Sequence, residues 1–94
     1  MDIRHTDDGK KGRFYIELDG SIEGEMTYVW AGNGRIIIDH TEVSDKLRGM
    51  SAGKQLVHKA VEFARERQIK IMPLCPFAHA VFQKTPEYDD VKAA

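Results

Sequence analysis

The stretch Leu47-Arg48-Gly49-Met50-Ser51-Ala52-Gly53-Lys54-Gln55-Leu56-Val57 joins a glycine-containing loop directly to the start of a helix. The first turn of a helix has backbone N–H groups without intrahelical partners, and the helix dipole adds partial positive charge there. Such a helix start binds anions, and glycine lets a ligand approach the backbone closely. Lys46, Arg48 and Lys54 add positive charge around it. The stretch therefore predicts either a pyrophosphate site or an ordinary loop and helix cap without function.

Two better-known phosphate-binding loops do not fit this stretch. The P-loop needs four residues between its glycines and a Ser or Thr after its lysine. Here three residues separate Gly49 from Gly53, and Gln55 follows Lys54. The dinucleotide pattern G-x-G-x-x-G is also absent from this junction.

The sequence after the loop changes to a helical period. Apolar residues recur at helical spacing and charged residues fill the other face, which predicts a helix over residues 50–67. The apolar positions are Leu56, Val57, Ala60, Val61 and Ala64. Residues 69–74 then read as a short apolar strand and residues 76–84 as a second helix, which Pro86 ends.

The sequence before the loop reads as an antiparallel meander. Residues 14–18 and 23–30 are strand-like and flank the turn signal Asp19-Gly20, and residues 35–43 follow a second turn signal, Asn33-Gly34. Residues 1–12 are charged, and we expect them to be loose. A strand, helix and strand in succession predict that residues 69–74 run parallel to residues 35–43. The fold class is therefore α/β, a mixed α+β sheet with three antiparallel strands, one parallel strand and two helices, in a single domain over residues 1–94.

Composition limits the classes of function. The 94 residues carry a net charge of -1, so nothing indicates a nucleic-acid partner or an anionic membrane surface. No apolar run approaches the roughly 20 residues that span a bilayer. The one cysteine, Cys75, excludes an internal disulfide and fits a reducing, cytoplasmic setting. The four histidines lack the spacing of a metal site, so we expect no metal.

The quoted stretch resembles the acetyl-CoA loop of the GCN5-related N-acetyltransferase (GNAT) superfamily, with Ser51 where a middle glycine is usual. Pro73-Leu74-Cys75-Pro76-Phe77, Pro86-Glu87-Tyr88 and Asp39-His40-Thr41-Glu42-Val43 resemble a compact, single-domain GNAT-like family. The resemblance covers the chain from about Phe14 to Tyr88.

The resemblance implies acetyl-CoA as cofactor. It places the pyrophosphate on Arg48, Gly49, Met50, Ser51, Ala52, Gly53 and Lys54. It also implies that the strands at 35–43 and 69–74 splay apart for the pantetheine arm. A backbone N–H near Val43 then binds the thioester carbonyl and stabilises the developing oxyanion. Larger relatives have further elements around the acceptor, so we expect an open acceptor face here.

Candidate catalytic residues are Cys75, His40 and Glu42. Cys75 precedes Pro76, which favours the first position of a helix, so the thiol is expected near a helix N-terminus, a setting that favours thiolates. The resemblance makes His40 its partner, for a relay in which Cys75 accepts the acetyl group. Alternatively, an acceptor amine attacks directly, with His40 or Glu42 as base through water. Each residue also has a non-catalytic interpretation: Cys75 as a small buried side chain, His40 as a hydrogen-bonded strand residue and Glu42 as a solvated one.

Two functions remain open from the sequence. One is an N-acetyltransferase that acts on an unknown amine or protein acceptor. The other is a CoA-binding or acetyl-CoA-binding module without catalysis.

Overall fold

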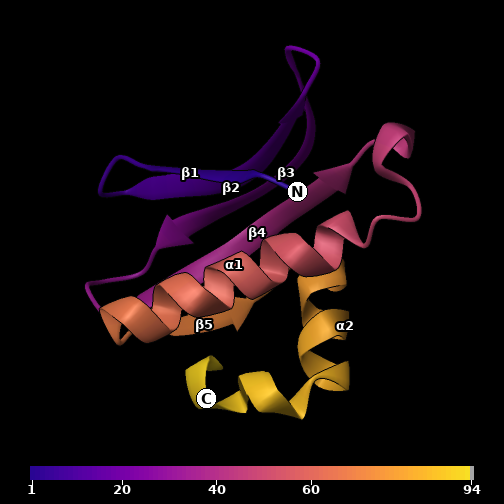
Figure 1. Ribbon diagram of the computed structural model, residues 1–94. Helices are drawn as coiled ribbons and strands as arrows, with labels where there is room; N and C mark the ends of the chain where they lie inside the picture. The colour runs from indigo at the N-terminus through magenta and orange to yellow at the C-terminus, as the bar shows by residue number, and fades with distance from the viewer. Residues whose placement is uncertain (94) are drawn as a thin grey trace.

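A five-stranded sheet with α1 across one of its faces forms the framework of the computed structural model, which describes residues 1–93 (Figure 1). The strands are β1 (Ile3–Asp7), β2 (Lys11–Leu18), β3 (Ser21–Trp30), β4 (Arg35–Val43) and β5 (Lys70–Pro73). The helices are α1 (Ala52–Arg67) and α2 (Pro76–Lys84), with 3-10 turns η1 (Asp45–Leu47) and η2 (Pro86–Val91). The strands stand in chain order, and only the β4–β5 pair is parallel. The predicted mixed sheet and the parallel final strand are confirmed.

The core lies between the sheet and α1. Alternate residues of β3 and β4 are fully buried against the apolar side of α1, as period-two and helical patterns require. They include Met26, Tyr28, Ile36 and Ile38 from the strands and Leu56, Val57, Ala60, Val61 and Ala64 from α1. In Figure 1, α2 and the C-terminal turn lie beyond the β5 edge, where Phe82 and Val91 complete the same core.

The N-terminal segment differs from the sequence-based expectation. Residues 1–12 were expected to be loose, but Ile3–Asp7 forms β1 and pairs with β2 from Ile3↔Ile16 to Asp7↔Gly12. The reason is a long-range contact: the Tyr28 hydroxyl and the Trp30 indole both donate to the Asp7 carboxylate, at 2.5 and 2.8 Å. Tyr28 reaches Asp7 across Gly12, where any Cβ would clash with its hydroxyl.

Element boundaries follow local chemistry. The second helix occupies the predicted residues, with Cys75 at its N-cap and Pro76 at its first position. The first helix begins at Ala52, later than predicted, because Ser51 takes a left-handed conformation with φ 53°. Within the described residues no helix has the length and apolar character needed to cross a bilayer.

Candidate functional site

A gap opens between β4 and β5, where their pairing stops. The parallel register runs only from Arg35↔Lys70 to Ile38↔Pro73. The backbone amides of Leu74 and Cys75 then both donate to the Ile38 carbonyl, at 3.1 and 3.0 Å. The chain therefore leaves the sheet at that point, while β4 continues to Val43 without β5 beside it.

Unused backbone donors line the β4 side of this gap. The Ser44 amide donates to the Glu23 carbonyl of β3 at 2.7 Å. Because successive amides of a strand point in opposite directions, the amides of Thr41 and Val43 point away from β3 and into the gap. The sequence-based expectation of a donor near Val43 is compatible with this arrangement, and Thr41 supplies a second one.

A loop rich in free amides stands at the mouth of the gap. Gly49 and Ser51 adopt positive φ angles of 81° and 53°, which turn the chain sharply from η1 into α1. Within the part of the chain that the structure describes, the amides of residues 51–54 donate no hydrogen bond. The Ser51 hydroxyl forms no cap hydrogen bond either. The helix start thus combines free amides with the positive end of the helix dipole, an arrangement that favours an anion.

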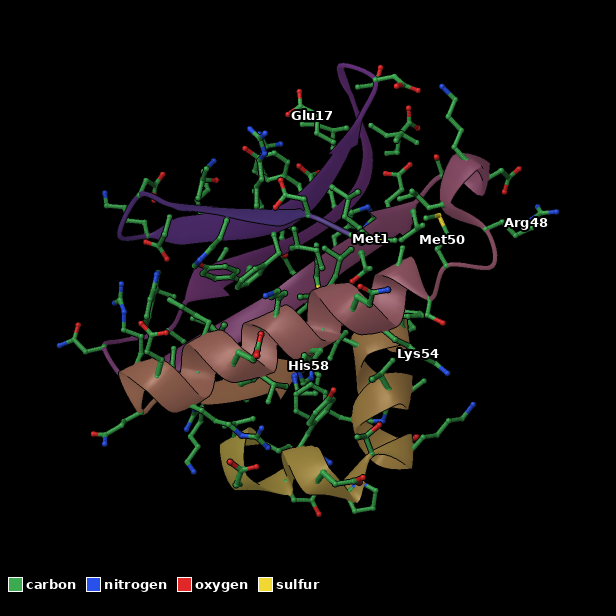
Figure 2. All side chains as sticks on the ribbon, in the orientation of Figure 1. Met1, Glu17, Arg48, Met50, Lys54 and His58 are labelled. Carbon is green, nitrogen blue, oxygen red and sulfur yellow. The ribbon has the colours of Figure 1, made fainter. Side chains whose placement is uncertain are left out.

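The side chains of the loop leave this site open. Arg48 extends away from the body of the protein and pairs with Asp45 at 3.0 Å, in a fully solvated ion pair (Figure 2). Lys54 projects from the first turn of α1 and is exposed, whereas Ala52 is buried. The two basic side chains therefore stay available to an anion, since a solvated ion pair is weak.

Gly53 serves packing as well as access. A Cβ at Gly53 would lie 2.5 Å from the Phe77 ring, so α2 approaches α1 closely at this point. Phe77 itself is 40% exposed. Val43, Met50 and Leu74 are also exposed apolar side chains, and they belong to the segments that border the gap. An elongated ligand with an apolar arm would cover this rim.

The Cys75 thiol lies at the base of the gap and is almost fully buried. Its sulfur accepts a hydrogen bond from the Ala78 amide at 3.4 Å, as an N-cap residue does. The same sulfur lies 3.2 Å from the Thr41 hydroxyl of β4. Cys75 is therefore held between the start of α2 and the strand whose amides face the gap.

The structure does not bring His40 to Cys75. A bulge in β4 leaves Asp39 as an extra residue, because Thr27 pairs with His40 while Tyr28 pairs with Ile38. The bulge turns Thr41 toward the core side and His40 and Glu42 toward the opposite face of the sheet. There the His40 and Glu42 side chains lie 3.5 Å apart and are both exposed. The expected His40–Cys75 pair is replaced by a Thr41–Cys75 contact, which the sequence reasoning missed.

Tyr88 of the Pro86-Glu87-Tyr88 motif lies in contacts that hold the fold together. Its hydroxyl lies 2.9 Å from Nδ1 of His58, which points from α1 toward η2 (Figure 2). Its ring packs against Phe82 at 5.6 Å. Burial raises the pKa of Tyr88, although Arg65 opposes this. Tyr88 therefore ties η2 to the two helices. Residues 1–93 contain no cluster of three side chains suited to a metal ion.

The chain matches a known protein family over most of its length. The family model described as GCN5-related N-acetyl-transferase matches residues 13–91. A GCN5-like protein from Staphylococcus aureus, solved by NMR, is 37% identical, with a TM-score of 0.78 over 99% of this chain and 88% of that chain. Protein NATD1 from Xenopus tropicalis is 28% identical over 89% of this chain and 78% of its own length.

More distant structures share the fold alone. One is a Bacillus anthracis protein solved in complex with acetyl coenzyme A, which is 22% identical with a TM-score of 0.61. The match covers 86% of this chain and 47% of that one. A ribosomal-protein-alanine N-acetyltransferase from Brucella melitensis is 20% identical, with a TM-score of 0.64 over 93% of this chain and 64% of that one.

Proposed function

Because the chain belongs to the GCN5-related N-acetyltransferase family, we propose that it binds acetyl-CoA and transfers the acetyl group to an amine. The observation that carries this proposal is the gap between β4 and β5 beside an amide-rich helix start. A pantetheine arm fits an open strand edge, and a pyrophosphate fits free helix-terminal amides. The Bacillus anthracis structure, which holds acetyl coenzyme A on this fold, supports the same choice of ligand.

The proposed coenzyme position uses two sets of backbone donors. The amides of residues 51–54 hold the pyrophosphate, with the loop at Gly49 and the side chains of Arg48 and Lys54 around it. The thioester then lies in the gap, where the amides of Thr41 and Val43 point. A donor fixed at the carbonyl oxygen polarises the thioester and stabilises the oxyanion that forms when a nucleophile attacks.

Two routes transfer the acetyl group from that position. In the direct route, a neutral amine attacks the carbonyl carbon, the carbon–sulfur bond breaks and CoA leaves as a thiolate. His40 or Glu42 takes the proton of the amine through water, and both are exposed on the face that an acceptor would approach. In the relay, the Cys75 sulfur attacks the carbonyl carbon first, the carbon–sulfur bond of acetyl-CoA breaks, and the thiol proton passes to the leaving CoA. Cys75 is then an acetyl thioester, which the amine cleaves to give the amide and the free thiol. The Ala78 amide and the Thr41 hydroxyl hold the Cys75 sulfur in position for this role.

Mass spectrometry separates the two routes. The protein is mixed with acetyl-CoA, quenched in acid within seconds and digested. The relay predicts an acetyl group on Cys75 that an added amine removes, and Cys75→Ala should then lose turnover while it still binds acetyl-CoA. An unlabelled Cys75 together with full turnover of Cys75→Ala would leave only the direct route.

A non-catalytic CoA-binding module is the second candidate, favoured by the almost complete burial of Cys75. The rate at which free CoA appears decides between the two functions. An enzyme releases CoA faster when amines or lysine peptides are added. A module shows saturable binding, and its CoA release does not change with any acceptor.

A further inference from the structure

A hollow of about 390 Å³ lies on the face of the sheet opposite α1. Its lining includes Lys11, Arg13, Thr27, Val29 and Asp39, whose side chains alternate with those of the core and remain partly or fully exposed. The volume falls in the range of small-molecule sites, roughly 300–1,000 Å³. The proposed coenzyme site on the other side of the sheet does not use this space.

The charge of the hollow favours a cation, because three carboxylates (Asp7, Asp8 and Asp39) and two cations (Lys11 and Arg13) line it. The Asp39 carboxylate accepts a hydrogen bond from the Thr27 hydroxyl at 2.6 Å, which holds it in place. Among the described residues no cationic side chain pairs with Asp39, whereas the nearby Arg13 is already bound to Glu25 at 2.5 Å. Val29 adds an apolar wall beside Asp39. A fixed carboxylate next to an apolar surface matches an ammonium group carried on carbon.

The position of Asp39 connects the hollow to the gap. Asp39 is the bulge residue of β4, and it follows Ile38, the residue at which β5 leaves the sheet. Thr41, whose amide points into the gap, is two residues further along the strand. An ammonium held by Asp39 would therefore lie near the open side of the gap, while the coenzyme arm enters from the loop side.

We propose that the hollow beside Asp39 is the acceptor site and that it takes a primary amine on an apolar stem. This inference rests on the proposed function. Asp39 acts at the binding step: the ammonium must pass its proton to solvent before the neutral nitrogen attacks the thioester carbon. The carbon–sulfur bond then breaks, and the leaving CoA thiolate takes up a proton, so that an amide and free CoA result.

A binding experiment tests the site without any need for turnover. Amide NMR spectra of the 94-residue protein are recorded with 4-phenylbutylamine, with the neutral 4-phenylbutanol and with Nα-acetyl-lysine methylamide. We expect the amines to shift the amide signals of residues 11–13, 27–29 and 39, and the alcohol to bind at least tenfold more weakly. The relative affinities of the two amines separate a free amine from a lysine side chain as the natural source. A smaller hollow lined by residues 22–25, 42 and 44 is the alternative site. Shifts confined to those residues, or no shifts at millimolar amine, would overturn the assignment.

A charge variant adds a kinetic test. Asp39→Asn removes the charge at constant size, and the matched control Glu66→Gln removes one charge from the exposed side of α1. We expect the KM for the amine to rise about tenfold in Asp39→Asn, as for the loss of one charge-assisted hydrogen bond in a solvated site. Glu66→Gln should leave the amine KM unchanged, and neither variant should change the affinity for acetyl-CoA. An unchanged amine KM and unchanged amine-induced NMR shifts in Asp39→Asn would refute the proposal. If the parent protein does not bind acetyl-CoA, the proposed function is refuted. The amine titration alone then shows whether the hollow binds an amine.

Discussion

Gly53 shows how a single residue serves both packing and ligand access. An added methyl group would enter the Phe77 ring at 2.5 Å and push α2 away from the start of α1. We expect Gly53→Ala to lower the free energy of unfolding by about 1–3 kcal/mol, the usual cost of overpacking. Denaturant unfolding measures this loss, and calorimetry should show weaker acetyl-CoA binding.

Two variants control the Gly53 experiment. Gly34→Ala adds the same methyl group in open space at an ordinary backbone conformation, so it should leave both quantities nearly unchanged. Adding Phe77→Ala to Gly53→Ala should recover much of the lost stability, because it removes the ring that clashes. A Gly53→Ala protein as stable as the parent would show that Phe77 moves aside freely.

Thr41 is the residue whose role was hardest to predict from sequence. An uninterrupted alternation from Ile36 and Ile38 would place His40 on the core side. The bulge at Asp39 shifts the alternation by one residue, so Thr41 takes that place and contacts Cys75. A bulge is set by strand pairing across the sheet, and nothing in residues 35–43 alone reveals it.

Thr41→Val keeps the size of the side chain and removes the hydroxyl beside the Cys75 sulfur. If the relay operates, we expect kcat to fall at least fivefold and the affinity for acetyl-CoA to stay the same, since one hydrogen bond to the sulfur, worth about 1 kcal/mol, is lost. Thr41→Ser should restore kcat. Equal kcat in all three proteins would assign the hydroxyl to packing alone.

At the scale of elements, local signals predicted most of the helices and strands, whereas β1 needed information from distant residues. Cys75-Pro76 and Pro86 mark both ends of α2, and the turns at Asp19-Gly20 and Asn33-Gly34 separate the central strands. By contrast, Ile3–Asp7 has little apolar character of its own, and its pairing depends on Tyr28 and Trp30, more than twenty positions away.

The stability of the β1 attachment should depend on pH, through the protonation of Asp7. Burial by itself would raise the pKa of Asp7, but hydrogen bonds from Tyr28, the Gly9 amide and Trp30 outweigh it and lower that pKa below the usual 3.8. The ionised form is thus favoured in the folded protein, so its contribution is complete above pH 3.8 and is lost as the pH falls through the lower folded value.

Asp7→Asn should therefore lower the free energy of unfolding at pH 7 and weaken its decline below pH 4. Urea unfolding at a series of pH values measures both effects, and Asp2→Asn controls for the loss of one N-terminal charge. Parallel pH curves for Asp7→Asn and the parent would show that the Asp7 carboxylate does not hold β1.

For the whole molecule, the rise in Tm on adding a ligand tests the proposed anion site. A ligand at one hundred times its Kd adds about 2.7 kcal/mol to the folded state. We expect acetyl-CoA to raise Tm by several degrees. Pantetheine, which lacks the pyrophosphate, should raise Tm much less if the amides of residues 51–54 bind the pyrophosphate as proposed. Equal shifts with both compounds would move the main contacts into the gap.

The fold class was predictable because its period changes and turn signals are local, and the family resemblance added the coenzyme loop. The geometry of the candidate site was less predictable. Ser51 takes a left-handed conformation, and the bulge at Asp39 and the divergence after Ile38 depend on how the strands pair. All three features lie at the candidate site, outside the regular strands and helices that local patterns predict.

The double hydrogen bond to the Ile38 carbonyl has a kinetic consequence. Because both amides that turn the chain away from β4 are already satisfied in the free protein, the two strands are separated before any encounter. Association with the coenzyme should then follow a single exponential in stopped flow, with an observed rate that rises linearly with concentration. A rate that reaches a plateau would instead reveal a slow opening step ahead of capture.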